Sequence, residues 1–171
     1  WEREYFHYRV KFELPAELPL VSILIPTKDH PGVLRACLES IYRETTYPRF
    51  EVVLLDNGTT DDDALELIRR FELEHPDNFR TDRVEGPFNF ALLNNRGADV
   101  ANGDYLVLLN NDTVVKTPEW IEELLRFAQF PEVGAVGCKL LYPTGEDHHA
   151  GQESYVGWIP TLSADGLPET T

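Results

Sequence analysis

Residues 103–112 have the sequence Gly-Asp-Tyr-Leu-Val-Leu-Leu-Asn-Asn-Asp. The apolar run Tyr105–Leu109 is the clearest strand pattern in the chain, since a short continuous run of this kind is typical of a buried strand. Three polar side chains follow it at once, with neither Gly nor Pro to make them a routine turn. The stretch therefore predicts a strand that ends in a cluster of polar groups.

An alternation of apolar runs and helical patterns surrounds this stretch on both sides. The other expected strands are Val21–Ile25, Glu51–Leu55, Phe79–Val84 and Val133–Leu141. The expected helices are 33–42, 61–73, 91–101 and 117–128. We expect Gly103 to stop the third helix and Thr117 to cap the fourth. This rhythm predicts an α/β fold of Rossmann type, with a mostly parallel sheet and helices on both of its faces.

The composition of the 171 residues excludes several classes of protein. An apolar fraction of 42% fits a folded domain, and no apolar stretch approaches the roughly 20 residues that a membrane span needs. Thirty acidic and fifteen basic residues give a net charge of −15, which opposes binding to nucleic acid. A phosphorylated ligand would need a divalent cation to offset this charge. Cys37 and Cys138 lack metal-ligand spacing and suit a reducing cytoplasm.

The domain organisation follows from where these patterns begin and end. Residues 1–19 have no clear period and are interpreted as a lead-in segment. Residues 20–151 hold the strands and helices and form the expected domain. Residues 152–171 are rich in Gly, Pro, Ser and Thr and are expected to form a loose tail.

The candidate site lies at the ends of three strands. In an open α/β sheet, ligands bind outside the carboxyl ends of the strands. Polar clusters occupy that place after three of the expected strands: Pro26-Thr27-Lys28-Asp29, Asp56-Asn57-Gly58 and Asn110-Asn111-Asp112. We therefore expect these clusters to converge on one edge of the sheet.

Each acidic residue in these clusters has a structural interpretation beside the functional one. Asp29 either caps the helix that follows or faces a ligand, whereas Asp61–Asp63 suit the first turn of a helix. Asp56 follows four apolar residues, so its carboxylate is expected to be partly buried and to need a partner. Asn110 and Asp112 place oxygen donors at alternate positions, which favours a Mg²⁺ or Mn²⁺ site over a simple Asx turn.

The clusters also carry a resemblance to a known family. The matching stretches are Val21–Asp29, Glu51–Asp61, Asn94–Gly97, Gly103–Asp112, Lys139–Pro143 and His149–Gly151. In this order and with these separations, roughly residues 20–151 resemble the nucleotide-binding half of a family 2 glycosyltransferase with the GT-A fold. Any one stretch alone would be a weak match, and the combination carries the resemblance.

The resemblance implies roles for particular residues. Positions 26–29 (Pro26, Thr27 and Asp29 among them) would line the nucleotide pocket, and Asp56 and Asn57 would hydrogen-bond the base or ribose. Asn110-Asn111-Asp112 takes the place of the Asp-x-Asp motif, with Asp112 as the metal ligand, Asn110 as a second oxygen donor and Asn111 beside the substrate. Asn95 and Arg96 would lie next to the nucleotide-sugar. Arg96 would either offset diphosphate charge or serve a packing or surface role.

The resemblance also implies an activity. The donor would be a UDP-, dTDP- or GDP-sugar. Its sugar would pass, with inversion, to the hydroxyl of a glycan or lipid-linked acceptor in cell-surface polysaccharide synthesis, in the cytoplasm or at the inner face of the membrane. Nothing after Gly151 resembles the acceptor region that supplies the family's general base, and neither the Glu146–Asp147 pair nor His148–His149 is assigned that role.

Two alternatives stay open at this point. The first is a sugar-1-phosphate nucleotidyltransferase, although such an enzyme would need a Gly-rich basic loop after the first strand, and Pro26–Asp29 contains no Gly. The second is a nucleotide-binding module without turnover. A dinucleotide oxidoreductase is excluded, because it would need a Gly-x-Gly-x-x-Gly turn, which the chain lacks.

Overall fold

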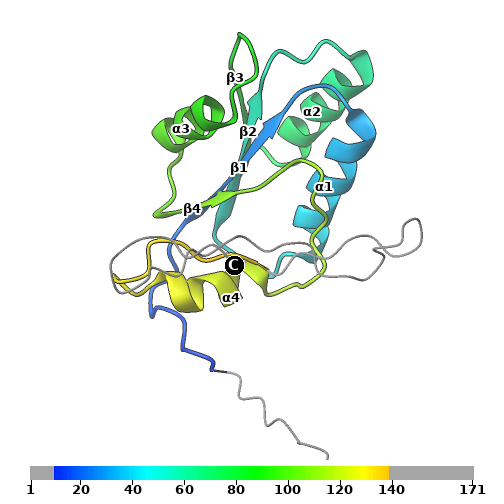
Figure 1. Cartoon of the computed structure of the whole chain (residues 1–171). Coiled ribbons are helices and arrows are strands. Elements are labelled where there is room, and N and C mark those ends of the chain that lie inside the picture. The colour runs from blue at the N-terminus through cyan, green and yellow to red at the C-terminus, as the bar shows by residue number, and fades with distance from the viewer. Residues whose placement is uncertain (1–9, 139–171) are drawn as a thin grey trace, which may run out of the picture. The chain divides into compact units, whose positions relative to one another are not determined.

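The computed structural model describes residues 10–138, in which strands and helices alternate (Figure 1). The strands are β1 (Val21–Thr27), β2 (Phe50–Asp56), β3 (Phe79–Arg83) and β4 (Tyr105–Leu108). The helices are α1 (Pro31–Glu44), α2 (Asp62–Glu74), α3 (Phe90–Val100) and α4 (Trp120–Ala128). The chain divides into two compact units after Arg126, and the sheet with its first three helices lies in the first unit.

The four strands form one parallel sheet in the order β3-β2-β1-β4. Val21 of β1 stands in register with Phe50 of β2 on one side and with Tyr105 of β4 on the other. Successive strands are added on one side of β1 until β3, and the chain then returns to the other side to form β4. The order of the strands therefore reverses between β1 and β4, which is where ligands bind in sheets of this kind.

Helices cover both faces of the sheet, as the sequence predicts. In Figure 1, α1 and α2 lie side by side on one face, and α3 lies on the other, against β1 and β2. Right-handed connections between parallel strands account for this arrangement. The connections through α1 and α2 lead from β1 toward β3, whereas the connection through α3 leads back across the sheet to β4, so α3 lies on the other face. Gly97 lets α3 lie close to the sheet, since a Cβ there would approach Leu55 Cδ1 to 2.8 Å.

Side chains of the two central strands form the core of this unit. Ile23, Leu24 and Ile25 of β1 are fully buried, and so are residues 52–55 of β2. Each such side chain contributes about 1.5–3 kcal/mol to folding by leaving water. The rigid centre that results fixes the strand ends from which the candidate site is built.

A buried carboxylate ties the sheet together at the edge opposite the candidate site. Glu51 accepts hydrogen bonds from Ser22 Oγ at 2.6 Å, from the Asn102 backbone N–H at 2.7 Å and from Arg80 Nη1 at 2.5 Å. Ser22 Oγ in turn accepts the Gly103 N–H at 2.8 Å. Burial raises the pKa of Glu51, but these hydrogen bonds outweigh it and leave the pKa below its ordinary value. The network holds the connection from α3 to β4.

Two predicted helix ends differ from the structure. Helix α3 ends at Val100, one residue before the expected end at Ala101. Gly103 lies beyond the cap and is needed where the chain approaches the Ser22 backbone so closely that a Cβ would come within 2.6 Å of it. Helix α4 begins at Trp120, and it is the carbonyl of Thr117, not its hydroxyl, that accepts the Trp120 N–H. The positions of glycines and of capping residues in a sequence predict where a helix begins or ends only to within a few residues.

The predicted strand Val133–Leu141 is wrong over the residues that can be described. Residues 133–138 contain no strand, and the glycines at 134 and 137 weaken any tendency of that segment to form one. Residues 139–141, residues 1–9 of the lead-in segment, the tail, and the acidic and histidine residues at 146–149 lie outside the described residues.

Candidate functional site

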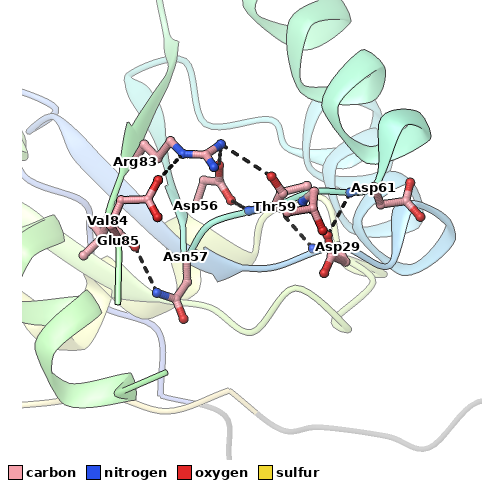
Figure 2. A network of polar contacts seen from close by, with 9 residues as sticks. Asp29, Asp56, Asn57, Thr59, Asp61, Arg83, Val84 and Glu85 are labelled. Atoms are coloured by element: carbon pink, nitrogen blue, oxygen red, sulfur yellow. Dashed lines mark hydrogen bonds and ion pairs between the residues drawn. The ribbon is translucent and has the colours of Figure 1, made fainter. Parts of the chain in front are cut away.

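Loops after β1 and β2 are joined by Asp29. Its Oδ1 accepts the backbone N–H of Thr60 at 2.8 Å and of Asp61 at 3.0 Å, and its own N–H donates to Thr59 Oγ1 (Figure 2). These two backbone bonds lower the pKa of Asp29. The cap of α1 is His30, so the interpretation of Asp29 as that cap is wrong. Asp29 and His30 both have positive φ, of 52° and 53°, and the hydrogen bonds of Asp29 to the loop after β2 help to hold this backbone conformation.

Asp61, in contrast, has the structural role expected of it. Its carboxylate accepts the Ala64 N–H at 2.9 Å and caps α2, whose first turn holds Asp62 and Asp63. These acids stabilise the helix through the cap and the dipole.

Asp56 is a buried carboxylate with a partner, as the sequence predicts. Its exposed fraction is 2%, and it accepts the Thr59 N–H at 2.7 Å and Arg83 Nη1 at 3.1 Å. Arg83 also donates through Nε to Glu85 at 2.7 Å, and the pKa of Arg83 is raised first by Glu85 and then by Asp56 (Figure 2). Arg83 is about half exposed, so this chain of charges reaches from the buried end of β2 to solvent.

Asn57 carries an unsatisfied acceptor beside this network. Its backbone N–H donates to the Thr27 carbonyl at 2.9 Å, and its Nδ2 donates to the carbonyls of Val84 at 2.9 Å and Gly86 at 3.2 Å. Its Oδ1 is buried and has no hydrogen-bond partner in the described part of the chain. A buried acceptor without a partner costs about 1–3 kcal/mol, and a ligand N–H would relieve that cost.

The third cluster follows β4 and meets the first at Thr27. Asn111 Nδ2 donates to Thr27 Oγ1 at 3.0 Å, while Asn110 and Asp112 are exposed. The turn here is closed by a backbone bond from Thr113 N–H to the Asn110 carbonyl, rather than by a side chain. Contacts of Thr27 with Asn57 and Asn111 bring all three loops together, and Pro26 is buried in β1 behind them. The predicted convergence of the clusters is therefore present.

The oxygen donors of this third loop fit a shared cation. Mg²⁺ is usually held by one or two carboxylates together with substrate phosphates and water, and not by a cage made of protein alone. Within residues 10–138 no three His, Cys, Asp or Glu side chains gather as such a cage. The exposed Asp112 carboxylate, with the Asn110 amide oxygen two residues away, suits a cation that a diphosphate completes.

Helix α3 contributes an open groove of about 500 Å³ next to the end of β3. Its lining residues are Val84, Asn89, Ala91, Leu92, Asn95, Arg96 and Asp99. Arg96 donates to Asp82 at 2.7 and 3.2 Å, and this ion pair raises the pKa of Arg96. The charge of Arg96 is thus already partnered, although its side chain is exposed.

Two residues at the site were not predicted from the sequence. Arg83 ends β3, and its contact with Asp56 depends on the pairing of β3 with β2. Asn94 of α3 is buried, donates to the Phe90 carbonyl at 2.8 Å and leaves its Oδ1 without a partner among the described residues. A polar residue on the buried face of a helix is the sequence feature that could have identified it.

A family model for glycosyl transferase family 2 matches residues 22–166. The chain belongs to this family. Over 144 residues it is 42% identical to the O-antigen biosynthesis protein RfbC of Myxococcus xanthus, a match that covers 84% of this chain and 11% of that protein. It is 28% identical over 139 residues to the glycosyltransferase GlyG of Streptococcus pneumoniae, covering 75% of this chain and 45% of that protein.

A solved structure of another glycosyltransferase shares the fold. The mannosyltransferase PcManGT of Pyrobaculum calidifontis, in complex with GDP-Man and Mn²⁺, superposes with a TM-score of 0.63 and 26% identity. The superposition covers 76% of this chain and 39% of that protein. The chain therefore spans less than half of each of these relatives. As a family 2 glycosyltransferase domain it has the GT-A-like α/β fold that the sequence predicts, and its relatives include polysaccharide-synthesis proteins. None of the helices found in residues 10–138 is long and apolar enough to cross a membrane.

Proposed function

We propose that this glycosyltransferase domain binds a nucleoside diphosphate sugar with Mg²⁺ or Mn²⁺ at the carboxyl edge of its sheet. The observation that carries the proposal is the meeting of three loops at Thr27, where the strand order reverses. One of these loops supplies an unsatisfied buried acceptor, and another supplies an exposed carboxylate. The mannosyltransferase of similar fold, solved with GDP-Man and Mn²⁺, supports this choice of ligands.

The base is assigned to the side of the site that Asn57 occupies. Both hydrogens of Asn57 Nδ2 are donated to backbone carbonyls, so this amide cannot donate to a ligand. Its Oδ1 has no partner among the described residues and can accept a hydrogen bond. Uracil, thymine and guanine each offer a ring N–H to such an acceptor, so we propose a UDP-, dTDP- or GDP-sugar. Asp56 and Arg83 hold the neighbouring backbone and give that side of the site its charge.

The diphosphate is assigned to the loop after β4. Asp112 and Asn110 would hold the cation, which supplies Lewis-acid stabilisation of charge on the leaving diphosphate. Asn111, tied to Thr27, keeps this loop against the end of β1, and Asp29 does the same for the loop after β2. Asn95 and Arg96 line the groove next to the end of β3, where we place the sugar.

Transfer to an acceptor hydroxyl also needs a general base within hydrogen-bond reach. We assign none of residues 10–138 to that role and propose that a carboxylate outside this chain supplies it, with inversion at the sugar. The acceptor would be a glycan or lipid-linked saccharide in cell-surface polysaccharide synthesis, which the match to an O-antigen biosynthesis protein supports. We place the reaction in the cytoplasm, or at the inner face of the membrane, since free Cys37 and Cys138 suit a reducing compartment.

Calorimetric titration of the chain with GDP, UDP and dTDP, each with Mn²⁺ and with EDTA, tests the proposal. At least one nucleotide should bind more tightly when Mn²⁺ is present. Asp112→Asn should abolish that gain, whereas Asp77→Asn should keep it, because Asp77 is also an exposed aspartate in a turn but lies just before β3, at the other edge of the sheet. Binding that Mn²⁺ never changes, or an Asp112→Asn variant that keeps the gain, would reject the cation site.

A further inference from the structure

The loop that follows β4 is fastened to helix α1 at two points. Cys37 and Ser40 lie one turn apart on the buried face of α1, with exposed fractions of 0% and 1%. Cys37 Sγ donates to the Asn110 carbonyl at 3.8 Å, and Ser40 Oγ accepts the Val115 N–H at 2.9 Å. The segment 110–115 is therefore an arch with both of its ends on the same helix.

The arch is also tied to β1 near its start. Asn111 donates to Thr27 Oγ1, and just before the arch the Leu109 N–H continues the ladder to the Leu24 carbonyl at 3.0 Å. Val115 is buried at the far end. Between these ties Asp112 remains exposed, and its charge lies near enough to the Cys37 thiol to contribute, after burial, to raising the pKa of that thiol to about 12.

Ser40 closes the arch in a way that requires a hydroxyl group. Its O–H donates to the Cys37 carbonyl at 2.8 Å while its oxygen accepts the Val115 N–H. Alanine at this position would leave the Val115 N–H buried without an acceptor, which favours opening of the arch at that end. A cation site on an opened loop has to order the loop each time the cation binds, and that requirement lowers affinity.

We propose that Ser40 is a positioning residue for cation binding, because it holds the arch that presents Asp112 from its anchor on α1. Cys37 is the second anchor of the same arch. This inference rests on the proposed function, since it takes Asp112 as the protein ligand of the cation. Loss of a group that orients a metal ligand typically lowers metal affinity by about 10–100-fold. The Mn²⁺-dependent gain in nucleotide affinity is therefore expected to fall about tenfold in Ser40→Ala.

Ser22 provides a matched control for this substitution. Its hydroxyl is also buried, also accepts one backbone N–H, from Gly103, and also donates one hydrogen bond, to Glu51. Ser22 lies near the start of β1, at the end of the sheet opposite the arch. Ser22→Ala should therefore lower the melting temperature as Ser40→Ala does, but it should leave the Mn²⁺-dependent gain unchanged.

The test is calorimetric titration of GDP and UDP into the wild-type chain, Ser40→Ala and Ser22→Ala, each with Mn²⁺ and with EDTA, together with thermal melts. The expected result is a reduced gain in Ser40→Ala alone, with similar EDTA affinities in all three. An equal gain in Ser40→Ala and wild type, or an equal loss in both serine variants, would overturn the inference while leaving the proposed function in place. No gain in the wild type would overturn both. If Ser40→Ala does not fold, Cys37→Ala removes the other anchor and is expected to reduce the gain in the same way, and a full gain there overturns the inference.

Discussion

Replacing Asn57 by aspartate tests how the candidate base site is held. The Asn57 amide donates two hydrogen bonds, to the carbonyls of Val84 and Gly86, at a position only 3% exposed. Asn57→Asp removes both donors and places a carboxylate against two carbonyl oxygens, with nearly the same volume. Two lost hydrogen bonds at about 1 kcal/mol each, plus about 1 kcal/mol or more for the poorly solvated charge, give a loss of about 3 kcal/mol. For a domain of this size that is a melting temperature lower by about 6–12 °C.

Asn111→Asp is the matched control, because the chemical change is the same and the partner differs. Asn111 donates to the Thr27 hydroxyl, which can rotate and donate to the new carboxylate instead. We expect a loss within about 1 kcal/mol there. The two variants and the wild type are compared by thermal and urea unfolding at neutral pH.

The pH dependence of Asn57→Asp follows from the same contacts. Facing two acceptors, the introduced carboxyl should have a higher pKa in the folded than in the unfolded chain, so its penalty is full at neutral pH and shrinks as the pH falls through the folded-state value. Unfolding at pH 7.5 and pH 5 should show the gap to wild type closing on the acid side. An Asn57→Asp variant as stable as Asn111→Asp at neutral pH would refute the arrangement of the amide.

Three further predictions concern other parts of the chain. Glu51→Gln should destabilise the fold by about 3 kcal/mol at neutral pH, because breaking a buried charge network is costly. The pKa of Glu51 is lowered in the folded chain. Urea unfolding should therefore show the difference in stability between the variant and the wild type fading as the pH drops from about 5 toward 3. Cys37, whose pKa is raised to about 12, should resist a maleimide reagent in the native chain at pH 7.5, and mass spectrometry should find it labelled only after unfolding. The 171-residue chain with Mn²⁺ and nucleotide-sugars should bind its donor but give no glycosylated product with mixed saccharide acceptors; robust transfer would contradict the proposal that the base is supplied from outside this chain.

The sequence predicts the sheet of this domain well because each central strand is a run of apolar residues. Val21–Ile25 and Glu51–Leu55 are buried in the core as expected, and the polar groups after them meet because parallel strands end at one edge. Asp56 following four apolar residues was sufficient to predict a buried carboxylate with a partner. The sequence could not show that this partner is Arg83, because Arg83 reaches Asp56 only through the pairing of β3 with β2 in the folded sheet.

The features that escaped prediction depend on three-dimensional contacts. Asp29 has the residue type of a helix cap, but a left-handed backbone turns its carboxylate toward the loop after β2. Residues 133–138 have an apolar content that suits a strand, but no strand forms there within the described residues. The lone acceptor of Asn57 is a property of where its amide hydrogens point, and a sequence does not record that.

The central claim is that nucleotide and cation meet between Asn57 and Asp112. A crystal structure of the chain with Mn²⁺ and the nucleoside diphosphate that binds best, with data collected for the anomalous signal of manganese, tests it directly. The account predicts a manganese peak at a coordination distance of about 2.1–2.3 Å from an Asp112 oxygen. It also predicts a base whose ring N–H donates to Asn57 Oδ1. A nucleotide bound away from the ends of β1, β2 and β4, or a manganese peak without Asp112 as a ligand, would contradict it.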